Sequence, residues 1–246
     1  NFISLGIGNG KKDKIVIKEL MKKSKVKYFP IDISLDMLEE GMRSISDSII
    51  ETTAYISDFK NLSDITERVR KSNNVPLLMS ILGNTLGNFG QIEILNTLKR
   101  GMTDKDFLLI ESTMRKEVGS KIHGEDIKKI VEDYNNSDFE DFAFTPLKKA
   151  GFKLNDGIIE VEYGPNPFYP KLSSIEVWFH LSKDKIVNYE GSEIVFKKGE
   201  RIRLYVSHKY TKENLYELLD GNGFEVLFFN LSEENDFGIT LCKLKN

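Results

Sequence analysis

The stretch that decides the fold is NFISLGIGNGKKDKIVIKELMKKSKVKYFPIDI, residues 1–33. Its apolar run Phe2–Leu5 is typical of a buried strand and leads directly into the glycine turn Gly6–Gly10. Apolar residues at helical spacing then predict a helix over residues 12–24, followed by a second strand that ends at Asp32. A strand, a glycine turn, a helix, a strand and a terminal acid make half of a nucleotide-binding fold.

The glycine turn indicates a ligand. Gly6, Gly8 and Gly10 permit positive φ and carry no Cβ, so backbone N–H groups at the helix start can approach a ligand closely. Asp32 lies about 20 residues further on, the spacing of an acid that binds a ribose diol. The Gly-x-Gly-x-Gly spacing differs from that of dinucleotide-binding proteins and favours a ligand without pyrophosphate, such as S-adenosylmethionine (SAM). The alternative is a βα turn that binds no ligand.

Composition narrows the class of protein. The 246 residues are 40% hydrophobic and 30% charged, which suits one α/β domain with an insertion. A net charge of −3 argues against a nucleic-acid partner bound through phosphates. The single cysteine, Cys242, cannot form an internal disulfide and fits a reducing compartment, so we expect a cytoplasmic protein. No apolar run approaches ~18 residues, and we expect no membrane span.

The pattern beyond residue 33 continues as helices that alternate with strands. Ser34 is the expected N-cap of the next helix. Further strands are predicted at 53–56, 75–82 and 107–110, and helices at 61–72 and 91–99. Five strands alternating with helices predict a doubly wound parallel sheet, part of an α/β fold.

The pattern changes after residue 116. A helix over 122–135 and a short helix from 146 precede a mostly alternating stretch, 158–206, which predicts an antiparallel insertion. A helix over 211–220 and a pair of strands, 224–229 and 237–242, close the chain. The predicted organisation is therefore one sheet domain interrupted by an antiparallel α+β insertion.

Four segments carry more specific motifs. They are LGIGNGKK at 5–12, YFPIDIS at 28–34, LGNTLGNF at 82–89 and VSHKY at 206–210. In this order they resemble the histidine-specific SAM-dependent methyltransferase family, known for the histidine Nα-methyltransferase of ergothioneine synthesis. The resemblance spans nearly the whole chain.

The resemblance implies a class I methyltransferase fold, with a Rossmann-like parallel sheet and terminal antiparallel strands. Residues 1–116 and 208–246 would form the SAM-binding domain, and residues 117–207 the inserted, mostly antiparallel α+β domain on the substrate side.

The resemblance also implies a role for individual residues. The cofactor would contact Gly6, Gly8, Gly10, Lys12, Asp32, Asp58, Phe59 and Gly83. Lys12 would attract the methionine carboxylate, Asp32 would hold the ribose, and Asp58 with Phe59 would meet the adenine. Asn88 would be the catalytic and substrate-binding residue, because its carbonyl would accept a hydrogen bond from the substrate amine and aim the nitrogen at the methyl group. Such a reaction needs placement more than an acid–base pair.

Several residues have structural alternatives. Asn88 could form an Asx turn that caps the following helix, and Asp58 could cap the helix near residue 61. His208 is expected to be structural or exposed rather than catalytic. Trp178 is expected in the core of the insertion, and Cys242 as an inert buried thiol. The histidines lack metal-ligand spacing, and we expect no metal site.

The substrate half departs from the family. Tyr205 stands where the family has a glutamate that binds the substrate imidazole, although the partner serine, Ser207, is retained. A tyrosine supplies no carboxylate for an imidazole N–H, so we expect Tyr205 and Ser207 to shape a pocket for another substrate. The family's carboxylate-binding tyrosine aligns near Gly124. The chain opens at Asn1 directly on a strand, without a signal peptide, and we expect that a preceding segment is missing.

We therefore expect a SAM-dependent N-methyltransferase that acts on an amino-acid-like small molecule, not histidine itself. One alternative is a cofactor-binding module without catalysis, serving as a regulatory or assembly subunit, which the altered substrate positions motivate. Another is a nicotinamide-dependent dehydrogenase, which the glycine spacing disfavours.

Overall fold

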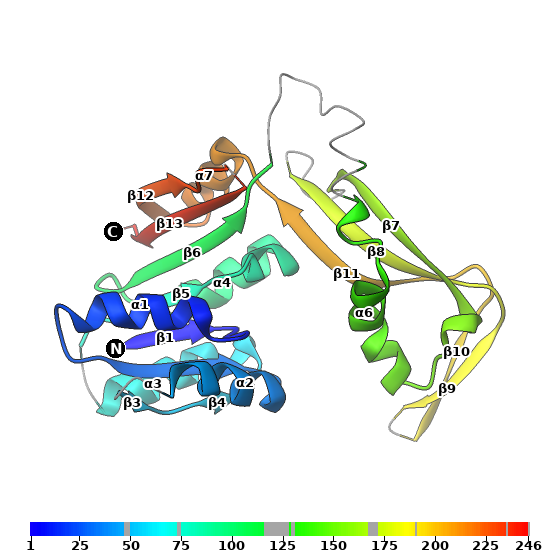
Figure 1. Cartoon of the computed structure of the whole chain (residues 1–246), viewed down its shortest axis with the longest axis horizontal. Coiled ribbons are helices and arrows are strands. Elements are labelled where there is room, and N and C mark those ends of the chain that lie inside the picture. Colours follow the sequence, from blue (N-terminus) through cyan, green and yellow to red (C-terminus); the bar gives the residue numbers. More distant parts are fainter. Residues whose placement is uncertain are drawn as a thin grey trace. The chain divides into compact units, whose positions relative to one another are not determined.

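The computed structural model describes residues 1–46, 50–72, 75–115, 128, 131–166, 172–189, 191–234 and 236–245. The chain forms two compact units (Figure 1). The first comprises Asn1–Met114 with Lys212–Asn246, and the second Arg115–Thr211. The bounds of the two domains predicted from the sequence stay a prediction.

The first unit is built on a sheet of eight strands, in the order β12-β13-β6-β5-β1-β2-β3, with β4 also paired to β2. The strands are β1 (Phe2–Leu5), β2 (Lys27–Asp32), β3 (Glu51–Thr52), β4 (Tyr55–Ile56), β5 (Leu78–Ile81), β6 (Phe107–Thr113), β12 (Phe224–Leu231) and β13 (Phe237–Leu244). β1 to β6 pair in parallel, whereas β13 is antiparallel to both β6 and β12. The predicted Rossmann-like sheet with terminal antiparallel strands is confirmed.

Helices cover both faces of this sheet (Figure 1). They are α1 (Lys11–Met21), α2 (Leu35–Ile45), α3 (Leu62–Ser72), α4 (Gln91–Gly101) and α7 (Lys212–Gly221). Phe2 and Tyr28 pack with Ile17 of α1 and Leu38 of α2 in one core cluster. All four residues of β1 are buried, because a central parallel strand is covered on both sides.

Two predicted strands of this unit are divided or shortened in the structure. The strand expected at 53–56 consists of the short strands β3 and β4. The strand expected at 75–82 narrows to β5, because Pro76 has no N–H and Leu77 donates its N–H to the Asp106 carboxylate at 2.8 Å. Ser34 caps α2 as predicted, its Oγ accepting from Met37 N at 3.3 Å.

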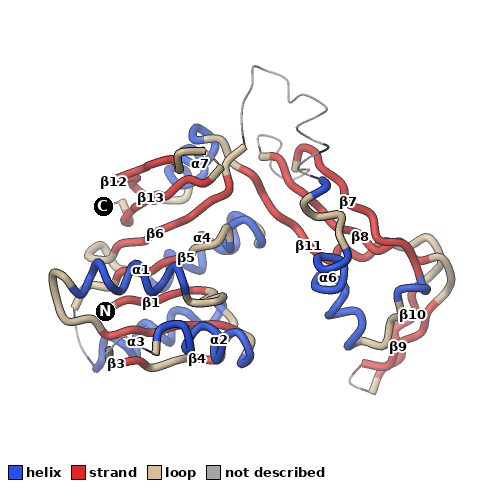
Figure 2. Tube along the Cα trace, viewed as in Figure 1, coloured by secondary structure: helices blue, strands red, loops and turns tan. Residues whose placement is uncertain are grey.

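The second unit combines strands with the helix α6 (Figure 2), and its strand pairs β7–β8, β8–β11 and β9–β10 are antiparallel. Its three-stranded sheet has the order β11-β8-β7, and a separate hairpin pairs β9 with β10. The elements are α6 (Ser137–Lys149), β7 (Gly157–Pro165), β8 (Ser173–Leu181), β9 (Lys185–Tyr189), β10 (Ser192–Phe196) and β11 (Arg201–Lys209). Phe144 of α6 packs with Phe152, Phe179, Leu181 and Val187 in its core. The predicted antiparallel α+β insertion is confirmed.

The second unit differs from expectation at one helix and one strand, and another predicted helix lies largely outside the described residues. The helix expected to start at Pro146 starts at Ser137, where the Asn136 side chain caps the first turn, and Pro146 lies inside it. β9 was not predicted. The helix expected over 122–135 falls largely outside the described residues, as do His123 and Gly124.

Within the part of the chain that the structure describes, every helix is too short or too polar to span a bilayer.

Candidate functional site

The glycine turn has the backbone that its sequence predicts. Gly6, Gly8 and Gly10 have φ of 78°, 53° and 71°, the left-handed region that favours glycine. A Cβ at Gly8 would meet no atom within 4 Å, so this part of the turn is open to a ligand. A Cβ at Gly10 would collide with the backbone carbonyl of Gly41 in α2. Gly10 therefore serves packing, and Gly8 leaves the open space.

Neighbouring strands bring several predicted residues to one edge of the sheet. Gly6 follows β1, Asp32 ends β2 and Gly83 follows β5, and these strands pair side by side in parallel. The Asp32 Oδ1 accepts from Ser34 N at 3.0 Å. Among the described residues no basic side chain pairs with Asp32, so its second oxygen is available to a ribose hydroxyl. A Cβ at Gly83 would also meet nothing within 4 Å.

Asp58 and Phe59 follow β4 at the same edge. Asp58 caps the short 3₁₀ helix Phe59–Asn61, its Oδ1 accepting from Lys60 N at 2.9 Å, so its capping role is present. The Phe59 and Phe89 ring centroids lie 5.6 Å apart. A Cβ at Gly6 would lie 3.7 Å from the Phe59 ring. The Phe59 ring therefore lies between the turn, which it neighbours at Gly6, and the Phe89 ring, and the exposed Asp58 precedes Phe59 in the sequence.

Lys12 has a partner that the sequence analysis did not assign. Its ammonium donates to the buried Glu111 carboxylate in β6 and lies 5.5 Å from the Phe237 ring centroid. Glu111 Oε2 also accepts from Gly83 N at 2.6 Å. Glu111 ends an apolar run, as Asp32 does, and this signal could have identified it. A cofactor carboxylate at Lys12 would have to share the ammonium with Glu111.

Asn88 ends the 3₁₀ helix η2 (Thr85–Asn88) and is half-buried. This helix is fixed to β6 by Asn84, whose Oδ1 accepts from Thr113 N at 2.8 Å. The N-cap residue of α4 is Gly90. The alternative that Asn88 forms an Asx turn at the start of α4 stays a prediction.

An ionisable pair lies buried beneath α1. The Tyr28 hydroxyl donates to the Asp13 carboxylate, which is 2% exposed. Burial raises the pKa of Asp13 to about 6, although hydrogen bonds from Ser4 and Tyr28 oppose the shift. Burial and the Asp13 charge together raise the pKa of Tyr28. The Asp13–Tyr28 pair therefore supports α1, the helix that follows the glycine turn, and is buried away from solvent.

Tyr205 and Ser207 belong to β11 of the second unit, where a β-bulge decides their direction. Arg203 pairs with Trp178, whereas Tyr205 pairs with the next residue back, Val177. The extra residue places Tyr205 and Ser207 on the face of the buried Val177 instead of the face of Arg203. Ser207 is 1% exposed and accepts from the Lys209 ammonium at 3.1 Å.

The remaining singled-out side chains divide into core and surface. His208 is buried, with its Nδ1 3.3 Å from Asn166 Nδ2, and is structural as expected. Cys242 is buried, which raises its pKa to about 12 and keeps the thiol inert. Trp178 is not a core residue, because it lies half-buried on the opposite face to Phe179, with the Arg201 guanidinium 4.4 Å from its ring centroid.

One group of metal-type ligands occurs on that surface. Donor atoms of Glu160, Glu162 and His180 lie within 4.8 Å of one another. Arg201 already binds Glu162 at 2.5 Å, and its positive charge disfavours a dication beside it.

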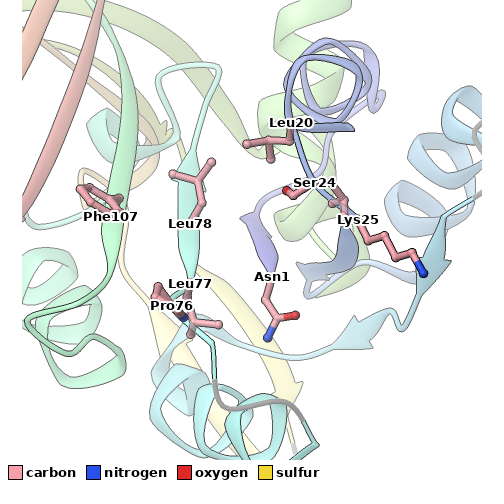
Figure 3. Close-up of a pocket in the computed structure, with 9 residues that line it drawn as sticks. Asn1, Leu20, Ser24, Lys25, Pro76, Leu77, Leu78 and Phe107 are labelled. Atoms are coloured by element: carbon pink, nitrogen blue, oxygen red, sulfur yellow. The ribbon is translucent and has the colours of Figure 1, made fainter. Parts of the chain in front are cut away.

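A cavity of about 190 Å³ lies at the other edge of the first sheet (Figure 3). It is lined at the amino-terminal ends of the strands by residues that include Asn1, Leu78 and Phe107. These are the ends opposite to Gly6, Gly83 and Glu111, so the cavity is separate from the candidate cofactor site.

The sequence pattern of the family described as "Histidine-specific methyltransferase, SAM-dependent" matches residues 1–244. The chain belongs to this family. The residues present fit the family's cofactor: the turn is open at Gly8, Asp32 has a spare oxygen, and the Phe59 ring lies beside Gly6.

Individual relatives are distant. The N-methyltransferase fsqC of Aspergillus fumigatus is 22% identical, covering 96% of this chain and 64% of that protein. The chain thus spans less than two thirds of the length of this curated relative.

Two solved structures are similar to this chain. A SAM-dependent methyltransferase from Clostridium acetobutylicum ATCC 824 has a TM-score of 0.44 and 10% identity, over 100% of this chain and 84% of that one. The PH0226 protein from Pyrococcus horikoshii OT3 has a TM-score of 0.49 and 13% identity, over 99% and 82%.

Proposed function

We propose that this protein transfers a methyl group from SAM to a nitrogen of an amino-acid-like small molecule other than histidine. The observation that carries the proposal is membership of a SAM-dependent family over residues 1–244. The relative fsqC is named an N-methyltransferase, which supports nitrogen as the acceptor atom.

The cofactor would lie along the edge of the sheet that holds the glycine turn. Bound there, SAM supplies a methyl group on a positively charged sulfur. Gly6, Gly8 and Gly83 would leave its methionine part close to backbone, Gly10 would let the turn pack against α2, and Lys12 would lie near the carboxylate. Asp32 would bind the ribose through the oxygen that Ser34 leaves unused, and Asp58 with Phe59 would contact the adenine.

Asn88 would position the acceptor nitrogen. Its side-chain carbonyl can accept a hydrogen bond from an amine N–H, which holds the nitrogen without neutralising its lone pair. Positioning of this kind can supply a large part of the rate enhancement when the leaving group is already good. Asn88 ends a short helix that Asn84 ties to β6, and this anchoring supports a positioning role.

Tyr205 and Ser207 would select the substrate. Both side chains lie on the face of β11 that they share with the buried Val177 and Ile175 of β8. Neither carries a formal charge at neutral pH. A pocket lined by a phenol and a hydroxyl cannot supply the carboxylate that an imidazole cation prefers. This supports a substrate other than histidine.

The cofactor part of the proposal is tested by replacing Asp32. Asp32→Ala is expected to weaken SAM binding by roughly 10- to 100-fold, because hydrogen bonds to a charged acceptor contribute about 1.5–3 kcal/mol. Titration calorimetry measures the loss, and Glu40→Ala, an exposed acid on α2, is the matched control. Equal binding by Asp32→Ala and the control would refute the ribose assignment.

The transfer itself is tested by incubating the protein with SAM labelled in the methyl group and a panel of amino acids and amines. Mass spectrometry should find a labelled N-methyl product that depends on Asn88, with histidine unmodified. A SAM-binding protein that yields no product would instead be a non-catalytic module.

A further inference from the structure

The second unit contains a buried cation without an acid beside it. Lys209, at the end of β11, is 7% exposed. Its ammonium donates to the Tyr134 hydroxyl at 2.9 Å and to Ser207 Oγ at 3.1 Å, and lies 5.2 Å from the Tyr134 ring centroid. Among the residues that the structure describes, no carboxylate forms an ion pair with it.

The bulge in β11 gives the cluster its direction. Tyr205, Ser207 and Lys209 occupy alternate positions after the bulge and pair with Val177, Ile175 and Ser173 of β8. Alternate residues of a strand share one face, so these three side chains lie on the buried side of the sheet. Without the extra residue they would share the side of Arg203.

Aromatic rings surround Tyr205 on this face. Its ring centroid lies 5.1 Å from that of Phe139, 6.1 Å from that of Tyr134 and 6.4 Å from that of Phe142. Phe142 is 64% exposed, so the aromatic group extends from the lysine to the protein surface. The cluster thus combines one cation, hydroxyl groups and an apolar wall that solvent reaches.

The positive charge of Lys209 is not balanced by a negative charge among the described residues. Removing an ammonium from water costs several kcal/mol unless an opposite charge accompanies it. Two hydroxyl groups and a ring face supply only partial negative charge, and an ammonium has three donors, of which two are used here. The full charge and a third donor remain for an anion that the described residues do not provide.

We infer that Lys209, with Tyr134 and Ser207, binds a carboxylate of the substrate, while the rings of Tyr205 and Phe139 contact its apolar or aromatic body. The inference rests on the proposed function, because it takes the bound molecule to be the methyl acceptor. It narrows the class of acceptor to amines that carry a carboxylate. Neutral amines of the same shape would bind weakly, because they would leave the lysine charge unmatched.

The test uses two aromatic acids that contain no amine, phenylacetate and indole-3-acetate, each against its neutral amide. Titration calorimetry with the full chain and S-adenosylhomocysteine should show tighter binding of each acid than of its amide. Lys209→Met should weaken acid binding by roughly 10- to 100-fold and leave amide binding unchanged, because it removes one charged hydrogen bond and keeps the apolar stem. Lys148→Met, an exposed lysine on α6, is the matched control.

A second variant adds the missing charge. Tyr205→Glu places a carboxylate on the face of Lys209, where it can pair with the ammonium, and should abolish the preference for acids. Equal affinity for acid and amide, no binding of either acid by the unaltered protein, or full acid binding by Lys209→Met would overturn the inference. Because these probes contain no amine, their binding is independent of N-methyl transfer. Acid-selective binding, with no methyl transfer to any amine of the panel, would refute the proposed function and leave the carboxylate site standing.

Discussion

Asp106 in the first unit and Lys209 in the second are both buried ions, and their surroundings differ. Asp106 is fully buried and accepts hydrogen bonds from Arg70, the Leu77 and Thr103 backbone N–H groups and the Thr103 hydroxyl. Lys209 has hydroxyl groups and a ring but no acid among the described residues. A buried ion with all its partners inside the chain serves the fold, whereas one without its counter-charge is suited to a ligand.

Replacing Asp106 should have the largest effect on stability. Asp106→Ala would leave Arg70 and two backbone N–H groups without their acceptor, and we expect a loss of about 3–5 kcal/mol in the free energy of unfolding. Urea denaturation measures it, with Asp104→Ala, exposed in the same turn, as the control. A loss no larger than that of the control would show that Asp106 does not stabilise the fold.

Asp13 is a buried acid beside which the described residues place no cation, and it offers a second test. Its pKa is about 6 in the folded protein against an ordinary value of 3.8, so its contribution to stability is present below about pH 4 and is lost as the pH rises to about 6. Asp13→Asn keeps an acceptor for Tyr28 and cannot ionise. The variant should therefore lack this fall in stability and exceed the unaltered protein by on the order of 2 kcal/mol above pH 7.

Thermal or urea denaturation between pH 4 and pH 8 follows that difference. Glu19→Gln, an exposed acid on the same helix, should retain the pH dependence of the unaltered protein. An Asp13→Asn variant with the same pH dependence would show that Asp13 is not ionised on the way to pH 7.

Lys209→Met should have the smallest effect on stability. It tests directly whether Lys209, unlike Asp106, is dispensable for the fold. The substitution relieves a buried charge while losing two hydrogen bonds to hydroxyl groups, so we expect a change within about 1 kcal/mol. The same urea titration measures it. A loss close to that of Asp106→Ala would mean that Lys209 supports the fold in the same way.

The sheet of the first unit could be predicted because its signals are local. The glycines follow directly after β1, and Asp32 ends the next strand. One short stretch of sequence therefore predicts the order of strand, glycine turn, helix and strand. The apolar runs of buried parallel strands are equally direct. The family resemblance then located Asn88, Tyr205 and Ser207 by matching motifs.

The rest depends on contacts between distant parts of the chain or on irregular backbone. The partner of Lys12 lies in β6, 99 residues away, and nothing near Lys12 announces it. Tyr134 reaches Lys209 across 75 residues. The bulge after Arg203 reverses which residues of β11 face inward, and an alternating pattern cannot reveal a single extra residue.

The contact between Gly10 and Gly41 has a consequence for engineering. A Cβ at Gly41 would lie 2.5 Å from the Ile7 side chain and 2.9 Å from the Gly8 carbonyl oxygen, so the backbone of α2 braces the loop from outside the glycine motif. If the glycine motif alone were grafted into another scaffold, it would lose its contact with the backbone of α2 at Gly41. A transplant would have to carry the second helix along, with its own glycine intact.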